Sequence, residues 1–202
     1  MARSTTTHRH THDCSGPLGL LAGLTMIAGR GPSARLVADL AAVGPADHVV
    51  DVGCGPGAAA REAARRGARV TAVDPSPQML RLARLLTRGD RRRSVELVAA
   101  SAEDLTLPDG TASVVWALAS AHHWHDVAAG LREAHRVLAP AGRLLVVERL
   151  TRPRGLFAHH ALTHEGAGTL ARAVADAGFV DVAVDEHRAG RRHLVVVRGR
   201  RA

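Results

Sequence analysis

The feature that most constrains the fold is an alternation of two hydrophobic patterns along the chain. From residue 47 onward, short apolar runs rich in Val alternate with segments in which apolar residues recur every three to four positions. The short runs predict buried strands and the longer spaced segments predict helices. We expect strands at 48–52, 69–74, 94–100, 112–118, 142–150, 179–186 and 193–198. We expect helices at 33–44, 58–67, 76–86, 126–138 and 166–178.

This alternation predicts an α/β fold. Strands that follow one another through helices form a parallel sheet, because right-handed crossovers place helices on both of its faces. The last two expected strands are joined by a short turn, which predicts an antiparallel hairpin. Ser33 and Ser76 are the expected N-caps of the first and third helices. The predicted fold is a single-domain, Rossmann-like, doubly wound, mostly parallel seven-stranded sheet with an antiparallel C-terminal edge hairpin.

The chain divides into three expected parts. Residues 1–16 are polar and are expected to form a disordered tail, residues 17–44 a helical segment that covers the ligand pocket, and residues 45–202 the main domain. The apolar stretch 17–29 follows an Arg/His-rich start, as a secretory leader would. No clear small-x-small cleavage site follows it, so a helix packed on the domain is favoured.

The basic charge of the chain has a compositional origin. The formal net charge is +8, which by itself suggests nucleic acid or a membrane surface as a partner. All 27 basic residues are Arg, however, and the chain has no Lys, Asn or Tyr, a bias that indicates a G+C-rich genome. Aromatic residues make up 2%, which leaves few platforms for stacking bases. The composition therefore disfavours nucleic acid as a partner.

Cysteine content and hydropathy favour the cytoplasm. Two cysteines are too few for a disulfide framework and suit a reducing compartment. No apolar run approaches the ~20 residues that span a bilayer. We therefore expect a cytoplasmic protein with no transmembrane segment.

A glycine cluster marks the expected ligand site. In a doubly wound sheet, ligands bind at the carboxyl ends of the strands, and VVDVGCGPG (49–57) ends the first expected strand. Gly53, Gly55 and Gly57 allow a tight turn and a close approach of the backbone to a ligand. The spacing also satisfies the dinucleotide fingerprint, with Asp74 placed as a ribose-binding acid. From the glycines alone, a nicotinamide cofactor and a purely structural turn both stay open.

Four segments in order narrow this choice. VVDVGCGPG (49–57) resembles the D-x-G-x-G-x-G loop of class I S-adenosylmethionine-dependent methyltransferases, and AVDPSPQML (72–80) resembles the segment after their second strand. ASAEDL (100–105) is similar to their adenine-contacting segment, and HRVLAPAGRLLVVE (135–148) to their R-x-L-x-P-G-G turn. The resemblance extends over roughly residues 45–150 and agrees with the terminal hairpin.

The resemblance implies S-adenosylmethionine as cofactor and S-adenosylhomocysteine as product. It assigns Asp74 to the two ribose hydroxyls and Asp51 to the cationic amino group of the methionine moiety, although Asp51 could instead serve only to pin the loop amides. Ser101 stands where the family often has an Asp that binds adenine, which leaves Glu103 or Asp104 for that role. The implied cofactor-binding residues are Asp51, Gly53, Cys54, Gly55, Gly57, Asp74, Pro75, Met79, Ser101, Ala102, Glu103 and Ala117.

A histidine-rich run, SAHHWHD (120–126), follows the fourth expected strand. In the family this position borders the transferred methyl group and its acceptor. Neighbours on an extended chain point to opposite faces, so only His123 and His125 share one, and no nearby cysteine completes a zinc site. We therefore expect no metal, and we expect His123, or else His122, to act as a general base. The loop at 151–166 is the other expected wall of the acceptor pocket.

The sequence therefore predicts methyl transfer to a small-molecule acceptor through O, N or S. The chain lacks the Asp/Asn-Pro-Pro-aromatic motif after the fourth strand, and neither cysteine has a Pro-Cys context, which disfavours a nucleic-acid methyltransferase. An NAD(P)-dependent oxidoreductase with the same glycine loop and a non-catalytic relative of the fold also stay open.

Overall fold

The computed structural model describes residues 30–87, 95–150 and 162–202. The expected tail at 1–16, the apolar stretch at 17–29 and most of the expected pocket wall at 151–166 lie outside the described residues.

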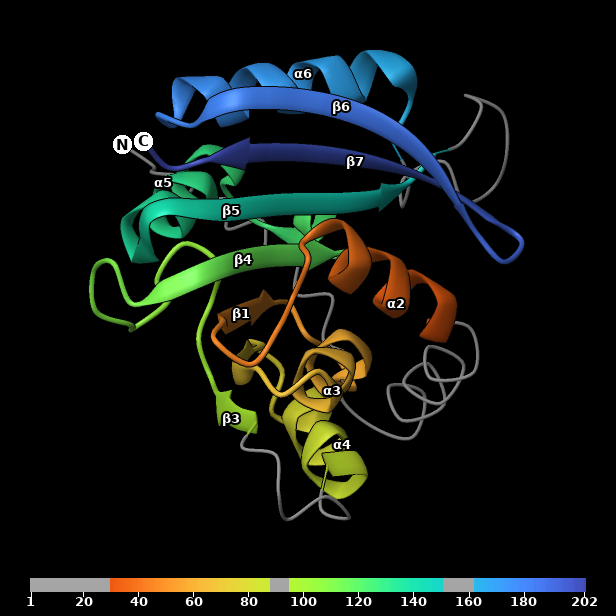
Figure 1. The fold of residues 1–202 in the computed structure, drawn as a ribbon, viewed down its shortest axis with the longest axis vertical. Helices are drawn as coiled ribbons and strands as arrows, with labels where there is room; N and C mark the ends of the chain where they lie inside the picture. The colour runs from red at the N-terminus through yellow and green to blue at the C-terminus, as the bar shows by residue number, and fades with distance from the viewer. Residues whose placement is uncertain (1–29, 88–94, 151–161) are drawn as a thin grey trace, which may run out of the picture.

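Seven strands form one sheet, as predicted. The strands are β1 (His48–Val52), β2 (Arg69–Val73), β3 (Val95–Val98), β4 (Ala112–Leu118), β5 (Leu138–Arg149), β6 (Val180–Ala189) and β7 (Arg192–Arg200). Their order is β3-β2-β1-β4-β5-β7-β6, and the labelled strands follow it from β3 at the bottom of Figure 1 to β6 at the top. All described pairings are parallel except those of β7 with β5 and with β6. The doubly wound topology and the antiparallel C-terminal hairpin are therefore confirmed.

Five α-helices and one 3₁₀ turn are present in the described residues. They are α2 (Gly31–Leu40), α3 (Ala58–Arg65), α4 (Pro77–Thr87), η1 (Ala121–His123), α5 (Val127–Val137) and α6 (His164–Asp176). None of these helices is both long enough and apolar enough to cross a bilayer.

The helix starts agree with the sequence only in part. The hydroxyl of Ser76 accepts the backbone N–H of Met79 at 3.4 Å, so its N-cap role is confirmed. Ser33 is not an N-cap, because α2 already begins at Gly31 with Pro32 in its first turn, where the fixed φ of proline suits a helix start. The Ser33 side chain is instead buried, and its hydroxyl has no hydrogen-bond partner in the described part of the chain.

Each face of the sheet carries its own apolar core. Alternate residues of a strand point to opposite faces, so Val49 faces α2, α3 and α4, while Val50 faces α5 and α6. On β4, Trp116 likewise faces α2, α3 and α4, and Ala117 faces α5 and α6. Helices cover both faces of the sheet. The part of the sheet that a ligand can reach is therefore the edge at which the parallel strands end.

Helix α5 passes close to the indole of Trp124. A Cβ built on Gly130 would lie 2.5 Å from Trp124 Cε3 and 2.8 Å from Cζ3, so only glycine fits here without displacing the ring. Trp124 in turn packs against the core beneath α5. This contact fixes the end of the histidine-rich segment against a helix.

Replacement of Gly130 by Ala should therefore destabilise the protein. Overpacking costs about 1–3 kcal/mol, which exceeds the gain of ~1 kcal/mol from the better helix propensity of Ala. The matched control is Gly168→Ala on α6, where a Cβ meets nothing within 4 Å and the propensity gain should appear alone. Urea unfolding of both variants measures the difference. Equal changes in the two variants would show that the Trp124 contact does not constrain the helix.

Candidate active site

The glycine loop, which connects β1 to α3, packs against the residues that follow β4. Gly53 has a φ of 70°, which a residue with a side chain rarely adopts, and a Cβ there would lie 2.5 Å from Ser120 Cβ. The Ser120 hydroxyl donates to the carbonyl of Val52 at 2.7 Å. Only a glycine thus lets the loop after β4 approach the loop after β1, and the two predicted segments meet at the switch point.

Asp74, directly after β2, holds the glycine loop in place. Its two carboxylate oxygens accept the backbone N–H of Gly55 at 2.8 Å and that of Ser76 at 2.9 Å. Burial raises the pKa of Asp74, and these two amides and the charge of Arg30 act against the rise. The loop amides are thus pinned by Asp74 and not by Asp51. Each oxygen of Asp74 keeps a second lone pair that can accept from a ligand hydroxyl.

Asp51, on β1, is a buried acid with an unsatisfied oxygen. It is 1% exposed, and its Oδ2 has no hydrogen-bond partner among the described residues. Burial raises its pKa to about 7, although the Trp116 indole, the Ala60 backbone N–H and the charge of Arg30 lower it. A buried carboxylate oxygen without a hydrogen bond is costly, which points to a ligand that donates to Oδ2 at this place.

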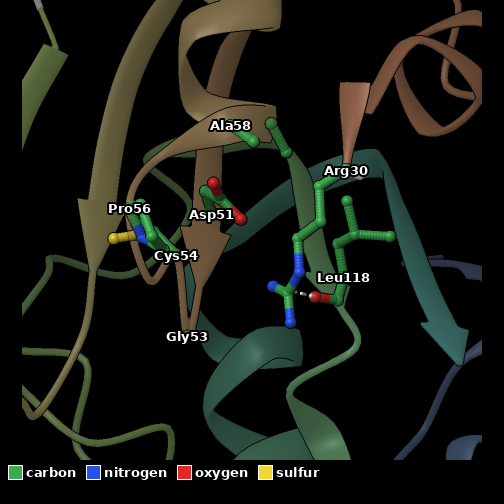
Figure 2. Close-up of a pocket in the computed structure, with 8 residues that line it drawn as sticks. Arg30, Asp51, Gly53, Cys54, Pro56, Ala58 and Leu118 are labelled. Atoms are coloured by element: carbon green, nitrogen blue, oxygen red, sulfur yellow. Dashed lines mark hydrogen bonds between the residues drawn. The ribbon is translucent and has the colours of Figure 1, made fainter. Parts of the chain in front are cut away.

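Arg30 enters the same hollow from the residue just before α2. Its guanidinium donates to the carbonyl of Leu118 at 3.5 Å, and Figure 2 shows it beside the Asp51 carboxylate. Burial and the charge of Arg192 lower the pKa of Arg30, while Asp51, Glu148 and Asp74 raise it. With Arg30 in place the free volume is about 10 Å³, roughly the room of one water. The sequence did not predict this residue, since one Arg among 27 carries no signal.

The segment after β3 supports the loop after β4. Glu103 accepts the backbone N–H of His125 at 2.8 Å and that of Asp126 at 3.2 Å. These bonds, with a contribution from Ser101, lower the pKa of Glu103 against the opposing effect of burial. Glu103 is therefore engaged with the protein itself, and Asp104 is the exposed acid of this segment.

The remaining predicted cofactor residues lie in different surroundings. Gly57 is the N-cap of α3 with a φ of 76°, and Cys54 lines the hollow beside Asp51. Met79 is buried on α4, whereas Ala117 packs in the core beneath α5. On β4 it is Leu118, the residue after Ala117, that lines the hollow.

The histidine-rich run is not extended, which corrects the expectation from the sequence. Ala121–His123 form the 3₁₀ turn η1, so the rings of His122 and His123 lie side by side with centroids 4.0 Å apart. His123, the first choice for a base, is exposed, while His122 is half-buried and bonded through Nδ1 to Glu148 Oε2 at 2.9 Å. Within residues 30–87, 95–150 and 162–202, no group of three or more His, Cys, Asp or Glu side chains could hold a metal ion.

A cavity of about 910 Å³ lies next to this turn, between the start of α5 and α6. It is lined by Ala121, His122, His125, Asp126, Val127, Ala128, Glu148, Leu162, Thr163, Glu165, Gly166, Thr169, Leu170 and Ala173. The volume is that of a small-molecule site. His122 is the predicted base that faces it, and His123 is not among the lining residues.

Comparisons with known proteins agree with this geometry. A family model described as a methyltransferase domain matches residues 50–146. The ubiquinone biosynthesis O-methyltransferase of Xanthomonas oryzae pv. oryzae is 35% identical over 161 residues, which cover 79% of this chain and 63% of that protein. The demethylmenaquinone methyltransferase of Tropheryma whipplei is 35% identical over 114 residues, which cover 56% of this chain and 46% of that protein. Residues 50–146 are therefore similar to a methyltransferase domain, and the chain as a whole is similar to these methyltransferases.

The methyltransferase fold also extends beyond the matched sequence. A SAM dependent methyltransferase from Aquifex aeolicus superposes with a TM-score of 0.72 at 19% identity, over 86% of this chain and 93% of that one. The chain itself spans 46% of the length of the Tropheryma relative. The matched family region, 50–146, runs from β1 into β5 and contains both the glycine loop and the histidine-rich turn.

The buried Asp51 gives a prediction for the pH dependence of stability. Its pKa is 3.8 in the unfolded chain and about 7 in the folded one, so below pH 3.8 the carboxyl is protonated in both states. As the pH rises from there to about 7, the unfolded chain loses a proton that the folded chain keeps, and folding is weakened. At 1.36 kcal/mol per pKa unit, the loss reaches about 4 kcal/mol and is complete above pH 7.

Asp51→Asn removes this titration. Urea unfolding of the wild type and the variant should give a difference in unfolding free energy that grows in favour of Asn from pH 4 to 7 and then levels off. Two parallel curves over this range would contradict a raised pKa of Asp51.

Proposed function

We propose that this chain transfers the methyl group of S-adenosylmethionine to a small-molecule acceptor. The observation that carries the proposal is the unsatisfied buried oxygen of Asp51 beside the charge of Arg30, at the same strand edge as Asp74. A carboxylate beside a guanidinium complements the ammonium and carboxylate groups at the zwitterionic end of an amino acid. A carboxylate with spare lone pairs complements a ribose diol.

The residues present fit this cofactor. Asp51 would accept from the cationic amino group, which would satisfy the orphaned oxygen and restore the charged form of the carboxyl. Arg30 would bind the carboxylate of the methionine moiety, and Asp74 the ribose hydroxyls. Because Arg30 nearly fills the hollow, its flexible side chain must change rotamer when the amino-acid end enters.

The chemistry asked of the protein is modest. The cofactor supplies a methyl group that is already bonded to a good leaving group. The chain's own residues hold the reactants in line and exclude water, which is the task of the closed strand edge around Gly53 and Ser120. A hydroxyl acceptor additionally needs a base.

A small acceptor in the cytoplasm is the favoured setting. The Xanthomonas and Tropheryma relatives are named for quinone biosynthesis, and the cavity of about 910 Å³ has room for a small molecule. The scattered Arg residues and the scarcity of aromatic side chains speak against nucleic acid. The low cysteine content suits a reducing compartment.

Asp74→Ala should weaken binding of S-adenosylhomocysteine by about 1.5–3 kcal/mol, the range for a hydrogen bond to a charged group. Isothermal titration measures this, and NADH should not bind the wild type. The control is Asp47→Ala at the opposite end of β1, where Asp47 accepts from Gly44 N, Ser113 Oγ and Arg143. The Asp47→Ala variant should have a lower free energy of unfolding, and it should bind S-adenosylhomocysteine as tightly as the wild type. Unchanged affinity in a folded Asp74→Ala protein would refute the ribose assignment.

Arg30→Gln should distinguish binding of the amino-acid end of the cofactor from binding of its adenosine end. If Arg30 binds the methionine carboxylate, the variant should bind S-adenosylhomocysteine about 10-fold or more weakly, from the loss of one charged hydrogen bond. Binding of 5′-methylthioadenosine, which lacks the amino-acid end, should be unchanged. An equal loss for both ligands would assign Arg30 to the fold of the site rather than to the carboxylate.

A further inference from the structure

Glu148 is a buried acid that the cofactor proposal does not use. It lies near the end of β5 and is 1% exposed, and its described hydrogen-bond donors belong to the turn after β4. Its Oε1 accepts the backbone N–H of Ala121 at 2.9 Å and that of His122 at 3.4 Å. Its Oε2 lies 2.9 Å from His122 Nδ1. One carboxylate therefore fixes both the backbone and the ring of the same residue.

These contacts determine where the imidazole proton resides. A carboxylate can only accept hydrogen bonds, so a neutral His122 must carry its proton on Nδ1. The lone pair is then on Nε2. The same arrangement, in which an acid fixes the tautomer of a histidine, serves general-base catalysis in serine hydrolases.

The pair lies between the hollow beside Asp51 and the large cavity. His122 and Glu148 both line the cavity of about 910 Å³. Glu148 is also close enough to Arg30 to raise the pKa of its guanidinium, as Asp51 does from the hollow. A molecule in this cavity therefore lies beside the histidine, and Glu148 links this side of the turn to the charge of Arg30 in the hollow.

We propose that Glu148 and His122 form a base dyad for an acceptor hydroxyl, with Glu148 as the positioning residue and Nε2 of His122 as the proton acceptor. This inference rests on the proposed methyl transfer and narrows it to acceptors that must lose a proton. The described charged groups around the cavity, Asp126, Glu148 and Glu165, are acids apart from the histidines, which suits a neutral hydroxyl better than an anion.

The proposed step is balanced. The hydroxyl oxygen forms a bond to the methyl carbon while the carbon–sulfur bond breaks, and the electron pair of that bond remains on sulfur. The hydroxyl proton passes to Nε2 of His122, which becomes an imidazolium next to the Glu148 carboxylate. No oxidant or metal is required.

Glu148→Gln is the decisive variant because it is isosteric but inverts the donor pattern. The backbone N–H groups of Ala121 and His122 can only donate, so the amide oxygen must take the place of Oε1. The amide NH₂ then replaces Oε2 and donates to Nδ1. The His122 proton is thereby driven to Nε2, and the lone pair needed for catalysis is lost.

The tautomer can be measured without knowing the acceptor. Long-range ¹H–¹⁵N spectra of the ¹⁵N-labelled protein, with His122 assigned from its loss in His122→Gln, should show the Nδ1–H form in the wild type and the Nε2–H form in Glu148→Gln. The matched control is Glu103→Gln, since Glu103 also holds this loop but accepts from the backbone of His125 and Asp126. That variant should keep the Nδ1–H form. An Nε2–H form in the wild type overturns the dyad.

Activity on two matched probes gives a second test. Phenol must lose a proton on methylation, whereas thiophenol is already ionised at pH 8. Glu148→Gln should lower kcat on phenol by about 10²–10⁴-fold, the range for loss of a general base or its tautomer. Transfer to thiophenol and the affinity for S-adenosylhomocysteine should be nearly unchanged. Equal losses on both probes would refute the dyad, while a wild type that fails to bind S-adenosylhomocysteine would refute the proposed function itself.

Discussion

The strand edge of this protein depends on how arginine charges offset three buried acids. Asp51, Asp74 and Glu148 are the charged residues that the described chain buries most completely, and they follow or end β1, β2 and β5. The charge of Arg30 acts on all three. The charge of Arg61 also acts on Asp51, and burial raises the pKa of Asp51 to about 7, so the acids are offset both by arginine charge and by protonation. Both proposed sites lie around this charge cluster.

The acids are not equivalent, because their hydrogen bonds differ. Asp74 accepts two backbone amides and Glu148 two amides and an imidazole, so each is tied into the structure. Asp51 has an oxygen without a described partner and a pKa raised to about 7. Asp51, the acid that faces the hollow, therefore lowers the free energy of unfolding. Such a loss of stability is common where a site is preorganised for a ligand. Asp74 and Glu148 position loops, whereas Asp51 keeps Oδ2 facing the hollow without a described hydrogen-bond partner.

The sequence predicted the fold well because its signals are local and repeated. The Val-rich runs indicated all seven strands, and the glycine spacing indicated the loop at the switch point. It could not predict Arg30, whose position depends on the packing of α2 rather than on any neighbour in sequence. Nor did it predict the backbone of the histidine-rich run, since the expectation that no metal binds there treated these residues as extended where Ala121–His123 form a 3₁₀ turn. Glu148 ends a family-like segment, yet its role depends on a partner 26 positions away.

The turn after β4 explains why one short segment can serve two sites. It is fixed at its start by Ser120 bonding to Val52, in its middle by Glu148, and at its end by Glu103. Each of these bonds comes from a different strand or the residues that follow it, so the turn cannot shift without disturbing the sheet edge itself. The separation between Asp51 and His122 is therefore set by the parallel pairing of β1 with β4 and of β4 with β5. A rigid separation of this kind is what an in-line transfer needs, because a misplacement of the reacting groups by about 1 Å can lower the rate about 10²-fold.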